Sequence, residues 1–168
     1  MGMDRKDVME TAIQLERDGR KFYHNAAEKA SNDIARQMFE SLAEDEVRHI
    51  EWLESVSPGE NTAGSVNRAL YGRLRGIFKD APETVMKAAA SCEDDINAMR
   101  LAIEMEEKSA AAYATWAEES EADDVRELCE MLADVERFHR ELIENSMEYL
   151  QHPGDWFMVE EGWHFDGG

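Results

Sequence analysis

The chain has 168 residues, and its 38 acidic and 18 basic side chains give it a formal net charge of −20. This length suits one domain with a sizeable core. The acidity argues against nucleic acid and anionic membranes as partners, because phosphate groups are bound by clustered Lys and Arg.

The first third of the chain predicts a helical hairpin. Residues 4–30 carry the 3.6-residue apolar period of an amphipathic helix, and a second such segment follows a few residues later. Asn32 or Asp33 can cap this second helix, which is expected to stop at Ser57-Pro58-Gly59. The short connection between them predicts antiparallel packing.

A second hairpin is predicted in the last third. Ser91 is a good N-cap for a third helix, and a fourth begins near Asp123 and ends before His152-Pro153-Gly154. Residues 58–90 are long enough to cross the length of a bundle, and 66–78 can form a short amphipathic helix within this crossover. We therefore expect an all-α four-helix bundle over residues 1–150.

The C-terminal tail and the two cysteines give further expectations about assembly and about the kind of metal site. Residues 151–168 form an aromatic tail that is expected to pack on the bundle or on a second subunit as a homodimer strap. Cys92 and Cys129 form no CxxC motif, which excludes a zinc ribbon or rubredoxin-type site. With no signal peptide and no apolar run near 18 residues, we expect a soluble cytoplasmic protein.

The two hairpins are copies of one another. A shift of 90 residues aligns them without a gap, and 15 of the 43 positions over residues 12–54 are identical to residues 102–144. The repeated polar residues lie on the apolar stripes of the helices, where a core is expected. They are four glutamates and two histidines: Glu16, Glu46, His49, Glu106, Glu136 and His139.

This set predicts a dinuclear metal site. Unpaired carboxylates in a core cost several kcal/mol each, so two divalent cations would balance the four charges. The two Glu-x-x-His pairs place both side chains on one helix face. Carboxylate and imidazole without thiolate suit iron, with manganese as the alternative.

Other residues on the same stripes are candidates for supporting roles. Tyr23 and Tyr113 follow Glu16 and Glu106 by two helical turns and are expected to donate hydrogen bonds to ligating carboxylates. A single Glu-x-x-His is commonly a surface pair, and a tyrosine at helical spacing is commonly core. The metal interpretation depends on all six polar residues recurring at one offset.

At these residues the sequence resembles the rubrerythrin and ferritin-like di-iron carboxylate proteins, over about residues 10–56 and 94–150. The resemblance implies a ferritin-like fold with two iron ions. It implies terminal ligands Glu16 and His49 for one ion and Glu106 and His139 for the other. Glu46 and Glu136 would bridge the ions.

The chain departs from the peroxide-reducing rubrerythrins at two points. They have a second carboxylate one turn after the third-helix ligand, where this chain has Ser109, so their redox-linked ligand exchange is in question. The rubredoxin module is also absent, so electrons would come from a separate donor such as a rubredoxin. An acidic donor is expected to dock on the basic crossover, through Arg68, Arg73, Arg75, Lys79 and Lys87.

The resemblance implies a non-haem di-iron oxidoreductase that reduces peroxide or dioxygen in oxidative-stress defence. Two alternatives stay open. The same site would serve a ferritin-like ferroxidase, iron-binding or iron-storage protein. The metals could instead stabilise a bundle that has an interaction role and no redox turnover.

Overall fold

A computed structural model describes residues 5–56 and 92–152, and these two ranges contain helices and no strand. The helices are α1 (Arg5–Lys29), α2 (Asp33–Val56), α5 (Cys92–Glu119) and α6 (Asp123–Gln151). Each begins and ends within a few residues of the position expected from the apolar period. The all-α class is therefore confirmed.

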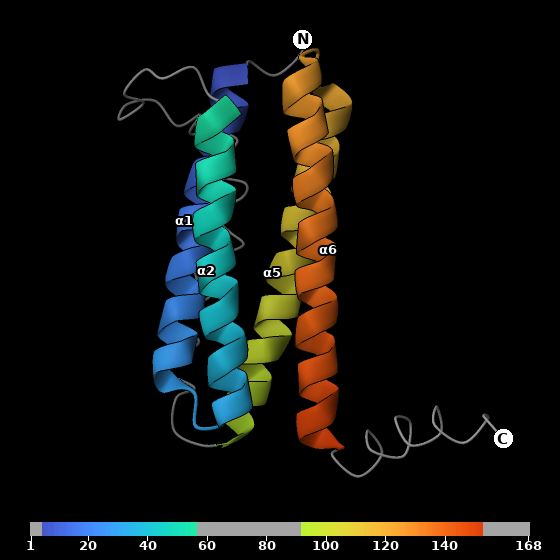
Figure 1. Cartoon of the computed structure of the whole chain (residues 1–168). Helices are drawn as coiled ribbons and strands as arrows, with labels where there is room; N and C mark the ends of the chain where they lie inside the picture. The colour runs from blue at the N-terminus through green and yellow to red at the C-terminus, as the bar shows by residue number, and fades with distance from the viewer. Residues whose placement is uncertain (1–4, 57–91, 153–168) are drawn as a thin grey trace, which may run out of the picture.

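The four helices form a bundle of two antiparallel hairpins, α1 with α2 and α5 with α6 (Figure 1). Between the hairpins, α2 lies against α6, and α1 meets α5 along a shorter contact. α2 ends and α5 begins at opposite ends of the bundle, as a crossover connection requires (Figure 1).

Several expectations lie outside the described residues. They are the course of the crossover 58–90, the short helix at 66–78, the basic docking stretch and the aromatic tail from residue 153 onward. The division into a bundle over 1–150 and a tail over 151–168 stays a prediction.

The turn between α1 and α2 is fastened to the second hairpin. Asn32 is the residue that caps α2, because its Oδ1 accepts hydrogen bonds from the backbone N–H groups of Ile34 and Ala35, at 2.8 and 3.4 Å. The buried carboxylate of Asp95 on α5 accepts bonds from the Ser31 hydroxyl (2.9 Å) and the Asn32 N–H (2.8 Å). Asp95 thus links the hairpins at this end.

Arg5 links the hairpins at the opposite end. Its guanidinium donates to the Val56 carbonyl at 2.6 Å and to Asp124 Oδ2 at 2.6 Å, so one side chain joins the start of α1, the end of α2 and the first turn of α6. Asp95 and Arg5 thus link the two hairpins by polar contacts at opposite ends of the bundle, and side-chain packing holds them together in the middle.

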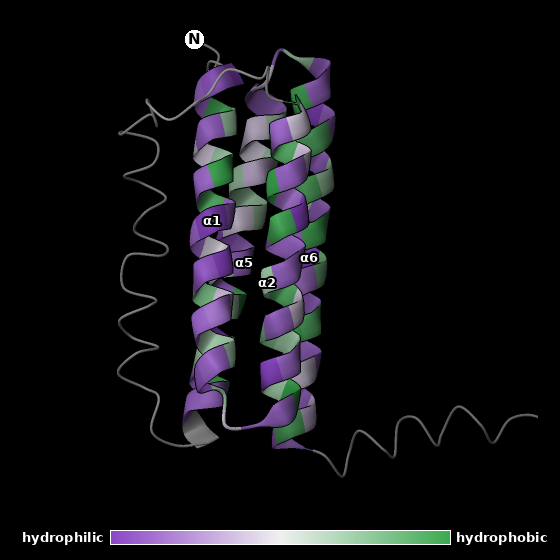
Figure 2. Cartoon of the chain, turned by 60° about the vertical axis from the view of Figure 1, so that its left-hand side comes forward, coloured by the Kyte–Doolittle hydropathy of each residue, from purple (hydrophilic) through white to green (hydrophobic). Residues whose placement is uncertain are grey.

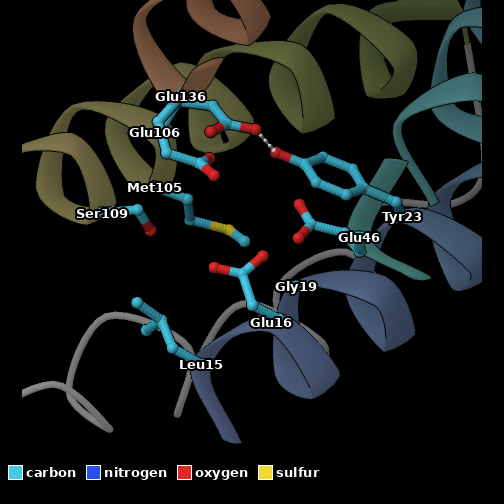
Figure 3. A pocket seen from close by; sticks show the side chains of 9 residues that line it. All are labelled: Leu15, Glu16, Gly19, Tyr23, Glu46, Met105, Glu106, Ser109 and Glu136. Atoms are coloured by element: carbon cyan, nitrogen blue, oxygen red, sulfur yellow. Dashed lines mark hydrogen bonds between the residues drawn. The ribbon is translucent and has the colours of Figure 1, made fainter. Parts of the chain in front are cut away.

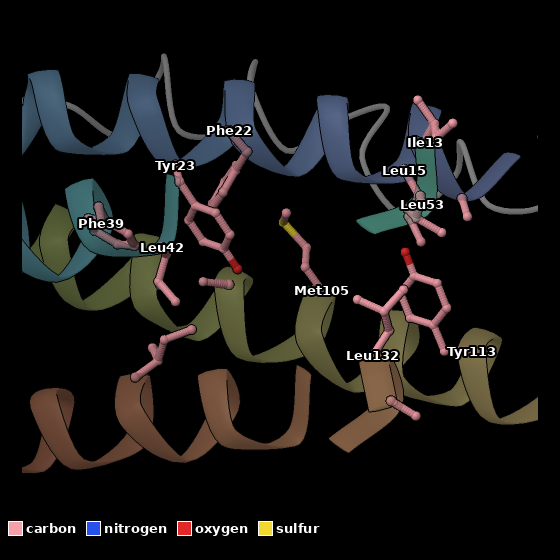
Figure 4. Packing of buried hydrophobic residues seen from close by; sticks show 14 of the residues in the cluster. Ile13, Leu15, Phe22, Tyr23, Phe39, Leu42, Leu53, Met105, Tyr113 and Leu132 are labelled. Atoms are coloured by element: carbon pink, nitrogen blue, oxygen red, sulfur yellow. The ribbon is translucent and has the colours of Figure 1, made fainter. Parts of the chain in front are cut away.

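Apolar residues recur along every helix (Figure 2), and the buried ones form a core cluster between the helices. Among the largest fully buried residues are Phe22, Phe39, Leu42, Leu53, Met99, Leu132 and Ile143, and Figure 4 shows part of this core. In the described ranges, none of the helices has the length and apolarity needed to cross a membrane. The core is interrupted halfway along by a group of buried polar side chains.

Candidate metal centre

Four glutamates and two histidines meet in the middle of the bundle. Each is at most 3% exposed, and each occupies a position on the same helical stripe as fully buried apolar residues. Glu46, for example, lies one turn after Leu42, and Glu136 lies one turn after Leu132. The predicted set is Glu16 on α1, Glu46 and His49 on α2, Glu106 on α5, and Glu136 and His139 on α6.

His49 lies among three of these carboxylates. Its Nδ1 is 2.9 Å from Glu16 Oε2, 3.3 Å from Glu136 Oε1 and 3.4 Å from Glu46 Oε2. These partners come from three different helices, so the imidazole occupies a junction of both hairpins. A single ring nitrogen thus faces three acceptors.

His139 occupies the corresponding place on the other half. Its Nδ1 is 3.6 Å from Glu106 Oε1 and 3.8 Å from Glu136 Oε2. The two imidazole rings are stacked, with centroids 5.3 Å apart and planes inclined by 14°. The two halves of the cluster therefore meet at the stacked rings of His49 and His139, in the centre of the bundle.

The side chains define two overlapping groups whose possible ligand atoms all lie within 4.8 Å of one another. One contains Glu16, Glu46, His49 and Glu136, and the other contains Glu46, Glu106, Glu136 and His139. Glu46 and Glu136 belong to both groups. This overlap is the arrangement that two neighbouring cations with shared carboxylates would need.

Unpaired atoms and ligand chemistry both fit a metal. Glu46 Oε2, Glu136 Oε1 and His139 Nδ1 are buried without a hydrogen-bond partner, and an unpaired buried polar atom costs about 1–3 kcal/mol. Cations bound at the cluster would satisfy these atoms. Carboxylate oxygens with imidazole nitrogens suit iron or manganese.

Without metal, protons balance the charges of the cluster. Burial opposes the charged form of each histidine, but the adjoining carboxylates outweigh it and raise the pKa of His49 and of His139 to about 10. Burial and neighbouring carboxylates raise the pKa of Glu46 and of Glu106 well above the ordinary value. Burial also opposes ionisation of Glu136, but the adjoining side chains of Glu106, His139 and His49 outweigh it and hold the pKa of Glu136 below the usual range.

The two tyrosines bond across the bundle. The Tyr23 hydroxyl donates to Glu106 Oε1, and the Tyr113 hydroxyl donates to Glu16 Oε1, so each tyrosine serves a glutamate of the other hairpin. Figure 4 shows both hydroxyls directed into the space between the helices. Burial and the nearby carboxylates raise the pKa of each phenol, which keeps both as hydrogen-bond donors.

A small cavity adjoins the carboxylates (Figure 3). It is lined by Leu15, Glu16, Gly19, Tyr23, Glu46, Met105, Glu106, Ser109 and Glu136. Its volume is about 10 Å³, which is room for about one water molecule. Gly19 and Ser109 occupy equivalent repeat positions, and a Cβ on Gly19 would stand 3.4 Å from Glu46 Oε1. The cavity therefore admits only a small molecule.

The structure brings together all six expected metal-binding residues and both tyrosines. The Cys129 thiol belongs to the apolar core instead, and burial raises its pKa to about 12. One contact was missed by sequence reasoning. Asp45 Oδ2 lies 3.3 Å from His139 Nε2, on the side of the ring away from Glu106 and Glu136. The available signal was a mismatch in the repeat, since position 135, equivalent to 45, is Val.

Comparisons with known proteins support this kind of site. The family model described as Rubrerythrin matches residues 7–147. A solved structure described as a hypothetical protein from Pyrococcus furiosus aligns with a TM-score of 0.64 and 21% identity, covering 89% of this chain and 92% of that one. No curated protein matches the chain significantly.

Proposed function

The chain belongs to the rubrerythrin family and has the expected ferritin-like fold, and from this premise we propose that it is a non-haem di-iron oxidoreductase acting on peroxide or dioxygen. The observation that carries the proposal is the pair of ligand groups that share Glu46 and Glu136. A structural metal ion needs one such group, whereas two ferrous ions that each give up one electron need two adjacent groups.

The proposed assignment follows the two groups. Glu16 and His49 would hold one iron, and Glu106 and His139 would hold the other, with the shared glutamates between them. When bound, a ferrous pair supplies the two electrons that reduce an O–O bond, and both ions become ferric. Manganese fits the same oxygen and nitrogen donors, and metal analysis of the isolated protein distinguishes the two.

The chain's own side chains would orient the ligands and select the substrate. Tyr23 and Tyr113 hold Glu106 and Glu16 by hydrogen bonds, which fixes the orientation of these carboxylates. The cavity beside Gly19 and Ser109 is too small for an organic substrate, which limits the substrate to a small molecule such as peroxide or dioxygen. Buried apolar walls at Leu15 and Met105 keep bulk water away.

Stopped-flow mixing tests the proposal. Protein loaded anaerobically with two equivalents of Fe(II) is mixed with peroxide or with oxygen, and growth of ferric near-ultraviolet absorption is expected with at least one of them. Glu136→Gln removes a shared carboxylate and is expected to abolish the fast phase. Glu130→Gln is the matched control, because Glu130 lies on the same helix six residues before Glu136 and its side chain is exposed. Loaded wild-type protein that reacts with neither oxidant would overturn the proposal.

Iron handling is the second candidate function, with iron as substrate. Because Ser109 stands where a second carboxylate would follow Glu106 by one turn, each half of the site has one unshared glutamate and one histidine. Iron titration with size measurement separates the two functions: uptake beyond two ions per chain in a closed shell would indicate storage. Metal that raises the melting temperature without any redox turnover would instead indicate the interaction bundle.

Electron supply and assembly complete the proposal. We expect electrons to come from a separate donor such as a rubredoxin. We also expect a cytoplasmic homodimer. Sizing of the purified protein and reduction assays with candidate donors test these expectations directly.

A further inference from the structure

A carboxylate outside the six-residue cluster contacts one of its histidines. Asp45 Oδ2 lies 3.3 Å from His139 Nε2, while Nδ1 of the same ring faces Glu106 and Glu136. The His139 side chain is 1% exposed and that of Asp45 is 25% exposed. Asp45 therefore approaches the imidazole from the outer side of the bundle, opposite the cluster.

The carboxylate of Asp45 is itself held in place. Its second oxygen, Oδ1, accepts a hydrogen bond from the Arg48 guanidinium one turn further along α2. Oδ2 is left directed across to α6 and His139. The result is a continuous polar connection from Arg48 through Asp45 to His139, and from there into the cluster.

Within residues 5–56 and 92–152, the other half of the repeat has no such connection to His49. The positions equivalent to Asp45 and Arg48 are Val135 and Phe138. The acid–base pair on α6 is displaced by one residue, to Asp134 and Arg137, whose side chains are 76% and 53% exposed. A shift of one residue turns the pair by about 100° around the helix, toward solvent.

The ring of His49 has a different neighbour. It stacks on the Trp52 indole, with centroids 5.5 Å apart and planes inclined by 26°. The repeat places Leu142 at the position equivalent to Trp52. The two histidines thus differ in their surroundings: a carboxylate contacts His139, and an aromatic ring covers His49.

We propose that Asp45 is a positioning residue that makes the two metal positions unequal, an inference that rests on the di-iron site proposed above. A carboxylate at Nε2 holds the proton on that nitrogen and directs the Nδ1 lone pair toward the metal. Such partners contribute about 10–100-fold in metal affinity. The position with Glu106 and His139 therefore binds its ion more tightly and fills first.

Titration with Co(II) tests this inference through binding alone, without any turnover. Calorimetry and visible absorption are expected to resolve two steps in the wild-type protein. Asp45→Asn is expected to weaken the tighter step by about 10–100-fold and leave the other unchanged. Asp134→Asn is the matched control, because it removes the same charge from an Arg-paired aspartate on α6 that faces solvent.

A second variant tests the same idea from the other half and does not depend on the folding of Asp45→Asn. Val135→Asp places a carboxylate at the equivalent position and is expected to tighten the weaker step, which narrows the gap between the two affinities. In the metal-free protein, ¹⁵N spectra of His139 are expected to show the Nε2–H group in a hydrogen bond to a carboxylate, and Asp45→Asn is expected to change this signal.

The outcomes separate the inference from the proposed function. Wild-type protein that binds no Co(II) at the cluster overturns the di-iron proposal and the inference with it. Wild-type protein that binds two ions, with Asp45→Asn giving the same two affinities, overturns the inference and leaves the di-iron site standing. A weak step that Val135→Asp does not tighten also counts against it.

Discussion

Gly19 is the position where helix stability and the proposed chemistry have opposite requirements. It lies inside α1, and glycine in a helix interior is about 1 kcal/mol less favourable than alanine. A Cβ at this position would stand 3.4 Å from Glu46 Oε1 and 3.5 Å from Glu46 Cδ, which are ordinary contact distances. Ser109, at the equivalent repeat position, already carries a Cβ beside the same cavity.

We therefore expect Gly19→Ala to stabilise the metal-free protein by about 1 kcal/mol, the full helix-propensity gain, because no clash opposes it. For a chain of this size that corresponds to a rise in melting temperature of about 2–4 °C. Urea unfolding of the metal-free protein measures the change in the free energy of unfolding. A variant less stable than wild type would refute the reasoning, since it would show that the added methyl group displaces Glu46.

The same substitution is expected to slow the iron-loaded protein. The methyl group enters a cavity that holds about one water molecule, so an oxidant has less room beside Glu46. Stopped-flow oxidation of the Fe(II)-loaded variant measures this, with Ser109→Ala as control because it keeps the Cβ and removes only a hydroxyl. An oxidation rate equal to that of wild type would show that oxidants do not use this cavity.

Three further predictions concern the tyrosine bond and the protons of the metal-free site. Tyr113→Phe removes the donor to Glu16 and is expected to cost about 1–3 kcal/mol in the metal-free protein; an unchanged urea midpoint would contradict the bond. Metal affinity is expected to rise with pH, because the pKa of His49 and of His139 is about 10 without metal and each ion must displace a proton. Calorimetry in buffers of different ionisation enthalpy counts these protons, and uptake without proton release would exclude the assignment. The raised histidine pKa values also stabilise the metal-free fold. This contribution is fully present below about pH 6.5 and is lost as the pH rises through 10. The melting temperature of the metal-free protein is therefore expected to fall across that window.

Most of the fold could be predicted from the sequence, because long helices with strong caps and breakers produce local signals. Asn32 and the Pro58-Gly59 breaker delimit α2 almost to the residue. The convergence of the six polar residues was also predictable, since the repeat places each of them on an apolar stripe. The start of α6 was less well marked: Ala122 makes no side-chain capping bond, and the helix begins instead with two acidic residues, Asp123 and Asp124.

The partners of the polar residues could not be predicted. Spacing places Tyr23 two turns from Glu16 on one helix, but its hydroxyl reaches Glu106 on α5, because tertiary packing decides which glutamate lies opposite. Asp45 was missed for a related reason. An aspartate beside a glutamate on an acidic helix looks like solvated surface, and only the packing of α2 on α6 brings it to His139.

The exchanged tyrosine bonds have a mechanical consequence. Tyr23 and Tyr113 reach across the interface between the hairpins in opposite directions, and each donates a hydrogen bond to a glutamate of the other hairpin. If one hairpin slid along the other by a single helical turn, about 5.4 Å, both hydroxyls would lose their glutamates together and the ligand groups would separate. The alignment of the two hairpins and the geometry of the metal cluster therefore depend on each other. A mutation that weakens the packing between the hairpins is expected to disturb metal binding, wherever along the bundle it lies.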